Sequence, residues 1–460
     1  MRRWIAWLVA GLLIVSVMGC FRSDEETFDK SKEIKLRVYM NVNPPQETFE
    51  GVYGQLLRAE FPNLKVEVIG PSDVPAIPDA DLRLQEVFEN GLADLVLLIS
   101  MDEYVTLADK GWLQELDPLI ERDGFDTSGM YPPVLEALRH YGGGKLYALA
   151  ESFDTNALLY NKDLFDKYGI PLPEDRMSWD EVLQLAQRFP SDGDKNTRIF
   201  GYSPYTNSEF PSAEAVFDMA ETEGLKIADW NTGRLTMDSP GWRRIIERAV
   251  QAYSSGAVRN SEQYGDLNHP FFSGRVAMTV AGYGFMKMIP DNMNWQLATA
   301  PVDPENRNRT NGFSLSFFFV MNKNAANPDA AWEIIKYMNS EKYGKLAAVE
   351  RNAPMTRMND SKEWKGRDLS AFYELSPTYP ARTSGTPSFQ LYYKLLPLVQ
   401  EELDAAINDG KSVEAAVKRI AEEGQVLMDL VLSEQEQKRQ QVMEELESKK
   451  AQSENNAGTE

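Results

Sequence analysis

Apolar and polar residues alternate over two short stretches early in the chain, at 34–40 and 64–69. Between these stretches and after them, apolar residues recur at helical spacing, over 49–61 and 81–89. A largely apolar run follows at 93–99, which is typical of a strand covered on both faces. This succession of strand, helix, strand, helix and strand predicts a parallel α/β sheet.

Capping signals mark further helices, downstream of a strand predicted at 145–149 and next to a second one at 157–160. Asn161 stands directly before a helical stretch and can cap its first turn. Ser178 and Glu181 are three residues apart, which is the spacing of a capping box. These signals predict helices that begin just after Asn161 and just after Ser178.

The C-terminal segment, 433–460, is rich in charged residues and has few large apolar ones. We predict a charged helix there that frays into a disordered tail near Ser453. The globular part of the chain is therefore expected to end near residue 432.

The first residues, 1–19, have the layout of a secretory signal peptide. Arg2 and Arg3 precede an apolar run, 4–19, that ends in small or flexible residues. This run is shorter than the roughly 20 residues that a membrane-spanning helix needs. We therefore expect the segment to be removed from the mature protein.

Cys20 is the single cysteine of the chain and stands directly after this run. The stretch Val17-Met18-Gly19-Cys20 is similar to the bacterial lipobox, although Met18 departs from the residues that are commoner at its place. That similarity implies cleavage before Cys20, lipidation of its sulfur, and a polar tether over 20–33. The alternative is an ordinary signal peptide or anchor with an incidental cysteine. With one cysteine, no intramolecular disulfide can form.

The charge balance narrows the choice of partners. The chain carries 70 acidic and 48 basic residues, a formal net charge of −22, and loss of 1–19 with its two arginines would make it −24. Such a protein is repelled by phosphate backbones and by anionic lipid headgroups. We therefore expect no nucleic-acid partner, and membrane contact through the lipid on Cys20 on the outer side of the cytoplasmic membrane.

Residue types that commonly carry catalysis are sparse. The two histidines, His140 and His269, are far apart in the sequence, and the chain has neither an HExxH motif nor a phosphate-binding loop. Paired carboxylates of the glycosidase kind remain conceivable among so many acidic residues, but nothing singles out a pair. The sequence predicts no cofactor.

One loop is a weak candidate for a calcium site. Asp192, Asp194 and Asn196 alternate in the manner of the first ligands of an EF-hand loop. The sixth position is Thr197 where that loop has Gly, and the twelfth is Ser203 where it has Glu. An Asp-rich turn without metal is the alternative.

Five stretches, taken in order, resemble the family 1 extracellular solute-binding proteins of ABC importers, the group that includes maltodextrin-binding protein. Each stretch has a plain structural explanation, and the resemblance rests on their joint order over about 34–432 together with the lipobox. The stretches are 144–149, 158–165, 177–182, 272–278 and 327–333.

This resemblance implies an α/β fold of the periplasmic-binding-protein-like type (type II), with two hinge-linked lobes and a central ligand cleft. The expected N-lobe is 34–148 plus 312–354, and the expected C-lobe is 149–311 plus 355–432. Binding would close the hinge, and an ABC permease would recognise the closed form. A monomer is expected.

Candidate ligand contacts in the N-lobe follow the first and third strands, because ligand sites in open α/β sheets lie at the carboxyl ends of strands. Asn41 and Asn43 can hydrogen-bond a neutral polar solute, although Asn also serves turns for backbone reasons. Asp102 and Tyr104 suit a sugar, through hydroxyl bonding and ring stacking, and relatives bind ligand in this loop. Asp102 could instead cap the next helix.

The other candidates lie at the expected crossings between lobes and in the C-lobe. By the resemblance, Asp154 matches an acidic ligand contact, and Phe153 stands beside it. Tyr283 follows a glycine where relatives place a stacking aromatic residue. Phe313 lies at the second crossing and could line the cleft, whereas 317–319 reads as a buried strand. The alternatives are a solvated hinge loop around Asp154 and a Tyr283 that packs elsewhere.

Together these features predict the substrate-binding lipoprotein of an ABC importer, with an oligosaccharide or other carbohydrate as its ligand. Two alternatives stay open at this point. One is a surface scaffold or adhesion lipoprotein, and the other is a secreted carbohydrate-active enzyme.

Overall fold

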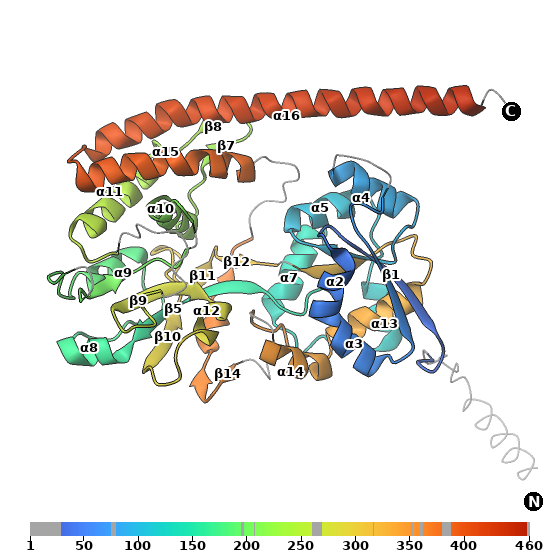
Figure 1. Cartoon of the computed structure of the whole chain (residues 1–460), viewed down its shortest axis with the longest axis horizontal. Helices are drawn as coiled ribbons and strands as arrows, with labels where there is room; N and C mark the ends of the chain where they lie inside the picture. The colour runs from blue at the N-terminus through green and yellow to red at the C-terminus, as the bar shows by residue number, and fades with distance from the viewer. Residues whose placement is uncertain are drawn as a thin grey trace, which may run out of the picture.

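Two β-sheets, one in each half of the molecule, organise the fold (Figure 1). The computed structural model describes residues 29–457, except 75–79, 195–196, 207, 260–268, 316, 351–352, 358–361 and 380–387. The predicted signal peptide, Cys20 and the tether as far as residue 28 lie outside the described residues.

The first sheet has the strand order β2-β1-β3-β13-β4. β1 pairs in parallel with β2 and with β3, while β13 is antiparallel to both β3 and β4. All four residues of β3 are buried, as the apolar run predicted. The predicted parallel arrangement is therefore confirmed for β2, β1 and β3, within a sheet that is mixed as a whole. The strands are β1 (Ile34–Met40), β2 (Leu64–Ile69), β3 (Leu95–Leu98), β4 (Ala148–Leu149) and β13 (Phe318–Met321).

Helices flank this sheet on both faces (Figure 1). The stretch predicted as one helix over 49–61 begins earlier, at Pro45, and contains a π-helical turn. The helices are α2 (Pro45–Phe49), the π-helical turn η1 (Glu50–Gly54), α3 (Gln55–Glu60), α4 (Ala80–Glu89), α5 (Met101–Asp109), α6 (Asp117–Asp123), α7 (Pro132–Tyr141), α13 (Pro328–Met338) and α14 (Glu341–Glu350).

The second sheet has the order β10-β5-β9-β6, and β12 also pairs with β5. Its strands are β5 (Asp154–Asn161), β6 (Phe200–Tyr202), β9 (Val276–Gly282), β10 (Trp295–Thr299) and β12 (Phe313–Ser314). Three small strand pairs lie outside it: β7 (Ala228–Asp229) with β8 (Arg234–Leu235), β11 (Arg309–Thr310) with β16 (Ser376–Pro377), and β14 (Glu363–Trp364) with β15 (Arg367–Asp368). The helices of this half are α8 (Lys162–Tyr168), α9 (Trp179–Ala186), α10 (Pro211–Thr222), α11 (Pro240–Ser254), α12 (Tyr283–Lys287), the 3₁₀ turn η3 (Ser370–Phe372), α15 (Ser388–Asn408) and α16 (Val413–Ala457).

The chain passes from one sheet to the other at two places, and a third stretch leads from α14, beside the first sheet, to β14 in the second half. The first passage leads from β4 into β5, and the second leads from β12 back to β13. β5 and β12 pair with each other, Thr155 opposite Phe313 and Asp154 opposite Ser314. The expected lobe boundaries near 148 and 312 lie next to these passages and stay a prediction.

Both predicted capping signals are confirmed. The Asn161 carboxamide oxygen accepts a hydrogen bond from the Asp163 amide at 3.1 Å. The Ser178 hydroxyl accepts from the Glu181 amide, and the Glu181 carboxylate accepts in return from the Ser178 amide at 2.6 Å.

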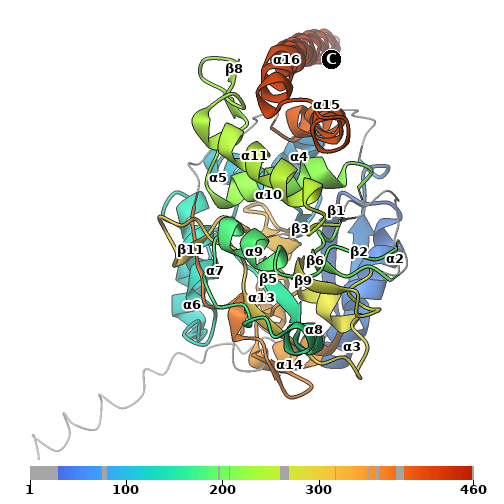
Figure 2. The ribbon, with the colours of Figure 1, turned by 90° about the vertical axis from the view of Figure 1, so that its left-hand side faces the viewer.

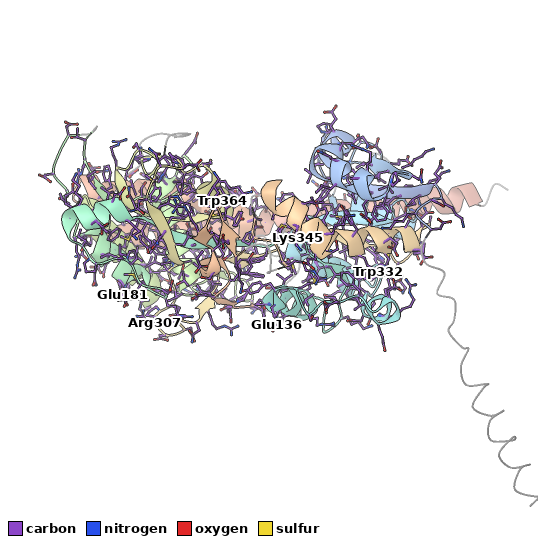
Figure 3. The ribbon with its side chains drawn as sticks, turned by 90° about the horizontal axis from the view of Figure 1, so that it is seen from below. Glu136, Glu181, Arg307, Trp332, Lys345 and Trp364 are labelled. Carbon is purple, nitrogen blue, oxygen red and sulfur yellow. The ribbon has the colours of Figure 1, made fainter. Side chains whose placement is uncertain are left out.

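Arg307, on the chain that leads toward β11, binds the same Glu181 carboxylate. Its guanidinium donates to both carboxylate oxygens, at 2.8 and 3.1 Å, and the two residues lie next to each other in Figure 3. The Arg307 bonds, followed by those from Ser178, lower the pKa of Glu181 to about 2. The start of α9 is thus tied to the segment that leads to the second passage.

The last helix, α16, is longer than the sequence predicted. It is continuous over 45 residues from Val413 to Ala457, so the expected fraying near Ser453 is wrong and no break occurs at 432. Its first part packs on α15, α11 and β8 and buries side chains as far as Val431. Beyond that point the helix runs on past the C-lobe and over the N-lobe (Figures 1 and 2). Within the described part of the chain, no helix combines the length and apolar character required to span a bilayer.

Candidate functional site

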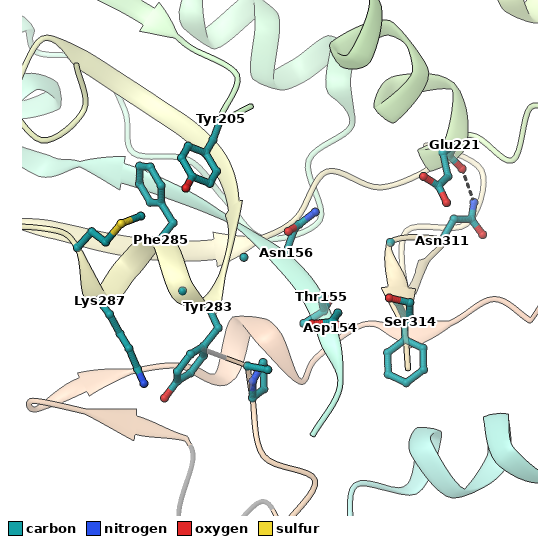
Figure 4. Close-up of a pocket in the computed structure, with 17 residues that line it drawn as sticks. Asp154, Thr155, Asn156, Tyr205, Glu221, Tyr283, Phe285, Lys287, Asn311 and Ser314 are labelled. Atoms are coloured by element: carbon teal, nitrogen blue, oxygen red, sulfur yellow. Dashed lines mark hydrogen bonds between the residues drawn. The ribbon is translucent and has the colours of Figure 1, made fainter. Parts of the chain in front are cut away.

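A cavity of about 640 Å³ lies where β5 and β12 pass between the two halves of the molecule (Figure 4). It combines aromatic rings with short polar side chains and a few charged ones. Its lining residues are Asp154, Thr155, Asn156, Tyr205, Glu221, Gly282, Tyr283, Gly284, Phe285, Lys287, Met288, Asn311, Gly312, Phe313, Ser314, Ala353 and Pro354.

Strand register explains why distant segments meet here. Asn156 of β5 pairs with Gly282, the last residue of β9, so the chain after β9 enters the cavity beside the start of β5. β12 lies along the same end of β5 and brings Phe313 opposite Thr155. The start of β5 therefore shares one wall with two segments that lie more than a hundred residues further along the chain. Tyr205, Phe285 and Tyr283 occupy one side of it, and Glu221, Asn311 and Ser314 the other (Figure 4).

Tyr283 lies at the cavity but is almost completely buried, and its contact with a solute stays a prediction. It is the first residue of α12, it lines the cavity, and only 4% of its surface is exposed. Its ring centroid is 5.7 Å from that of Phe372, and the Lys287 ammonium lies 5.4 Å from the Tyr283 ring. Burial raises the pKa of the Tyr283 hydroxyl and lowers that of the Lys287 amine. The ring is thus held in one orientation before any solute binds.

Asp154 and Phe313 also line the cavity, but Phe153 does not. Asp154 is exposed and Phe313 half-buried, whereas Phe153 is only 1% exposed. The Phe153 ring stacks on Tyr131 at 5.0 Å and lies 5.5 Å from Phe313. The predicted contact between Phe153 and solute is therefore replaced by a supporting role behind the Phe313 ring.

Tyr104 is the clearest departure from the sequence-based site. Its side chain is fully buried, its hydroxyl donates to the Leu138 carbonyl at 3.2 Å, and it accepts from the Tyr147 amide at 3.1 Å. The reason is the phase of α5. The Ser100 side chain caps this helix by accepting from the Glu103 amide, and Tyr104, one turn further on, then faces the core.

The remaining N-lobe candidates lie outside the cavity. Asp102 is exposed on the first turn of α5, where limited hydration raises the pKa of its carboxyl group; the capping role falls to Ser100 instead. Asn41 is half-buried and Asn43 exposed, both directly after β1. These residues stand at the carboxyl ends of parallel strands of the first sheet, apart from the rings of the second half.

Phe317, in the expected N-lobe, was predicted to be buried in a strand and is instead exposed. Phe318 and Phe319 are buried in β13 as predicted, but Phe317 is 55% exposed and has a left-handed backbone, with φ of 58°. The register of β13 with β3, Phe318 opposite Leu98, places Phe317 next to Ile99, which is 42% exposed. Two large apolar side chains are thus open to solvent at the carboxyl end of β3.

Several lining residues were missed by the sequence. Tyr205 follows the short strand β6, and its ring centroid lies 4.6 Å from that of Phe285. The rule that sites follow strand ends could have found Tyr205, had β6 been recognised. Glu221 lies in the last turn of α10 and is joined to the second passage because the Asn311 side chain donates to its carbonyl at 2.8 Å. That contact spans 90 residues of sequence and has no local signal.

The weak calcium candidate finds no support in the part that the structure describes. Asp192 and Asp194 are exposed, and Asp194 accepts a hydrogen bond from the Thr197 amide at 3.1 Å, as in an Asp-rich turn. Asn196 lies outside the described residues. Across the described residues, no group of three or more His, Cys, Asp or Glu side chains could hold a metal ion.

Comparison with known proteins adds a family match. The model of a family described as "Bacterial extracellular solute-binding protein" matches residues 44–345, about two thirds of the chain. A Brucella abortus (strain 2308) protein named as a binding protein is 23% identical over 401 residues, which is 82% of this chain and 87% of that protein. The resemblance stated from the sequence is therefore confirmed.

Solved structures share the fold. The sugar-binding protein MalE from Xanthomonas citri matches with a TM-score of 0.60 at 18% identity, over 89% of this chain and 99% of its own. An ABC substrate-binding protein from Listeria monocytogenes, in complex with cycloalternan, matches with a TM-score of 0.57 at 20% identity, over 86% and 100%. The two-lobe periplasmic-binding-protein-like fold is thus confirmed.

Proposed function

We propose that the cavity holds a carbohydrate, taking as premise that the chain belongs to the bacterial extracellular solute-binding protein family. The observation that carries the proposal is the lining of the cavity. Phe313 and the largely buried Tyr283 contribute aromatic rings to the lining, and Asn156 and Asp154 offer hydrogen-bonding groups beside them. A sugar presents apolar ring faces and a girdle of hydroxyls, so it can use both kinds of group at once.

The family and the structural neighbours of this chain are binding proteins and not enzymes, and the chain is a binding protein too. Its family is extracellular, so the protein works outside the cytoplasm. The names of the similar structures add support for the ligand class: one is a sugar-binding protein, and one was solved with cycloalternan.

The finer part of the proposal is the place of the protein in import. We infer that it captures its solute by hinge closure and passes it, as a monomer, to the membrane subunits of an ABC permease. Lipid on Cys20 would keep it near the permease, and two or more acyl chains would suffice for stable anchoring. Mass spectrometry of the mature N-terminus should find a lipidated Cys20; a free Cys20 thiol would contradict this part.

The ligand class is tested by a thermal-shift screen of the mature chain against monosaccharides, oligosaccharides and polyols. A true ligand should raise the melting temperature in proportion to the logarithm of its concentration over Kd. Calorimetric titration of the best hits then gives the affinity. If no carbohydrate shifts the melting temperature, the proposal fails, and the scaffold or adhesion alternative gains.

A further inference from the structure

One face of α10 carries a row of carboxylates that begins in the cavity. Glu221 lines the cavity, and Asp218 and Glu214 follow on the same face at helical spacing. The row extends about 10 Å along the helix axis, from the rise of 1.5 Å per residue. Asp218 and Glu221 are partly open to solvent, although the surrounding protein limits the hydration of both carboxylates. The cavity is therefore continuous with an acidic strip.

No described lysine or arginine forms an ion pair with Asp218 or Glu221. Limited hydration and then the negative charges of Glu221 and Glu214 raise the pKa of Asp218 to about 7, and limited hydration raises that of Glu221. Glu214, by contrast, accepts a hydrogen bond from the Thr206 hydroxyl. The ionised form of these carboxylates thus costs free energy, and a positive charge placed beside them would stabilise it.

Aromatic rings at the start of α15 border this strip. The Tyr392 ring lies 5.0 Å from that of Phe217 on α10, and burial followed by the charges of Glu214 and Asp218 raises the pKa of Tyr392. Tyr393 lies 5.4 Å from Tyr392, and Phe389 lies 4.6 Å from Tyr393. Phe389 is 71% exposed and Tyr393 is 53% exposed, among the most open large apolar side chains of the described residues.

The arrangement does not suit a metal ion. No described cluster of acidic, His or Cys side chains is close enough to share one. Carboxylates spread along a helix beside open aromatic faces instead match several separate positive charges, because ammonium groups are attracted both to carboxylates and to ring faces.

We propose that this acidic and aromatic strip, formed by α10 and the start of α15, holds the distal part of a chain-like saccharide that carries protonated amines. The other end of the same saccharide occupies the cavity. The inference rests on the proposed carbohydrate function and narrows it to aminated oligosaccharides. Two observations favour this occupant. Glu221 belongs to both the cavity and the strip, so one chain-like ligand can occupy both, and the carboxylates of the strip are opposite in charge to protonated amines.

The test is calorimetric titration of the mature chain with three probes near pH 6: a glucosamine tetrasaccharide, its fully N-acetylated counterpart, and maltotetraose. The aminated probe should bind at least about tenfold more tightly than the two neutral ones, the range for a few charge-assisted contacts. Its affinity should also fall as salt is raised, while neutral binding should not.

Variants assign the effect to the strip. Asp218→Asn and the double variant Phe389→Ala/Tyr393→Ala should each reduce the preference for the aminated probe severalfold. Asp166→Asn, a matched change of an exposed aspartate on α8, should leave the preference intact.

The outcomes separate the two proposals. If neutral saccharides bind and the aminated probe binds no better, the inference is overturned and the proposed function stands. If the preference exists but survives Asp218→Asn and the double variant, the strip is not its source and the inference is likewise overturned. If none of the saccharides binds, both proposals fail.

Discussion

The two walls of the cleft are built in different ways. The C-lobe wall is a set of rings that already support one another: Tyr205 packs on Phe285, and Tyr283 packs on Phe372. The expected N-lobe wall lies outside the cavity; it has short polar residues after β1 and, beside β3, two apolar side chains, Ile99 and Phe317, that are open to solvent. A preformed wall loses little entropy on binding, so we expect the C-lobe to hold the solute first and the N-lobe to close over it.

Replacing Tyr104 should give the largest effect, and should act on folding alone. Because Tyr104 fills the N-lobe core, Tyr104→Ala should lower the free energy of unfolding by about 3–5 kcal/mol, measured by urea denaturation. Tyr104→Phe keeps the ring and leaves the Tyr147 amide without its partner, at a cost of about 1–3 kcal/mol. If Tyr104→Phe left stability intact and weakened solute binding, the contrast between buried and cleft-facing aromatic residues would be lost.

Tyr283 tests the preformed wall. Tyr283→Ala should weaken carbohydrate binding by about 1–3 kcal/mol, roughly 5- to 150-fold, because a ring contact is removed. Tyr283→Phe keeps the ring and serves as the matched control, with affinity expected within a few-fold of the original. Unchanged affinity of the alanine variant in a calorimetric titration would remove Tyr283 from the site.

Phe317 tests the wall that closes. Since its side chain is largely exposed, Phe317→Ala should change the free energy of unfolding by no more than about 0.5 kcal/mol. It should weaken solute binding by about 0.5–1.5 kcal/mol if the ring covers the bound solute. A loss of stability without loss of affinity would instead mark Phe317 as part of the N-lobe core.

The smallest effect concerns the tie between α9 and the second passage. The folded pKa of Glu181, about 2, lies below its ordinary value of 4.5, so its stabilisation is present above pH 4.5 and is lost as pH falls toward 2. Arg307→Gln should therefore lower stability near pH 7 by about 0.2–1 kcal/mol, as for other exposed ion pairs, and by less near pH 2.5. Thermal unfolding of both proteins at the two pH values gives the comparison. An equal loss at both would show that charge is not the cause.

Local patterns predicted the fold well. β1 and β2 have the predicted bounds because the signal for a strand, the alternation of apolar and polar side chains, is local to the strand itself. α16 was underestimated at its end because its polar, charged sequence was read as disorder. Glu, Lys, Gln and Ala nonetheless favour helix when they continue one that is already anchored.

The site was predicted less well because its parts depend on contacts between distant segments. The resemblance to relatives pointed to Tyr283, which lines the cavity, while its contact with a solute stays a prediction. Tyr104 was misplaced because one side-chain cap, at Ser100, sets which face of α5 it occupies. Phe317 was misplaced because a left-handed residue interrupts the approach to β13, and its sequence neighbours give no sign of this. Glu221 reaches the cavity only through the packing of α10.

The long helix α16 has a mechanical consequence. It is anchored on the C-lobe as far as Val431, and the remaining residues to Ala457 reach about 39 Å further at 1.5 Å per residue. Because displacement grows with distance from the axis of rotation, a small rotation of one lobe against the other moves the helix tip much further than it moves the residues at the hinge. A dye at that tip and another on an exposed N-lobe residue would report solute capture as a change in energy transfer, with the cleft itself left unmodified.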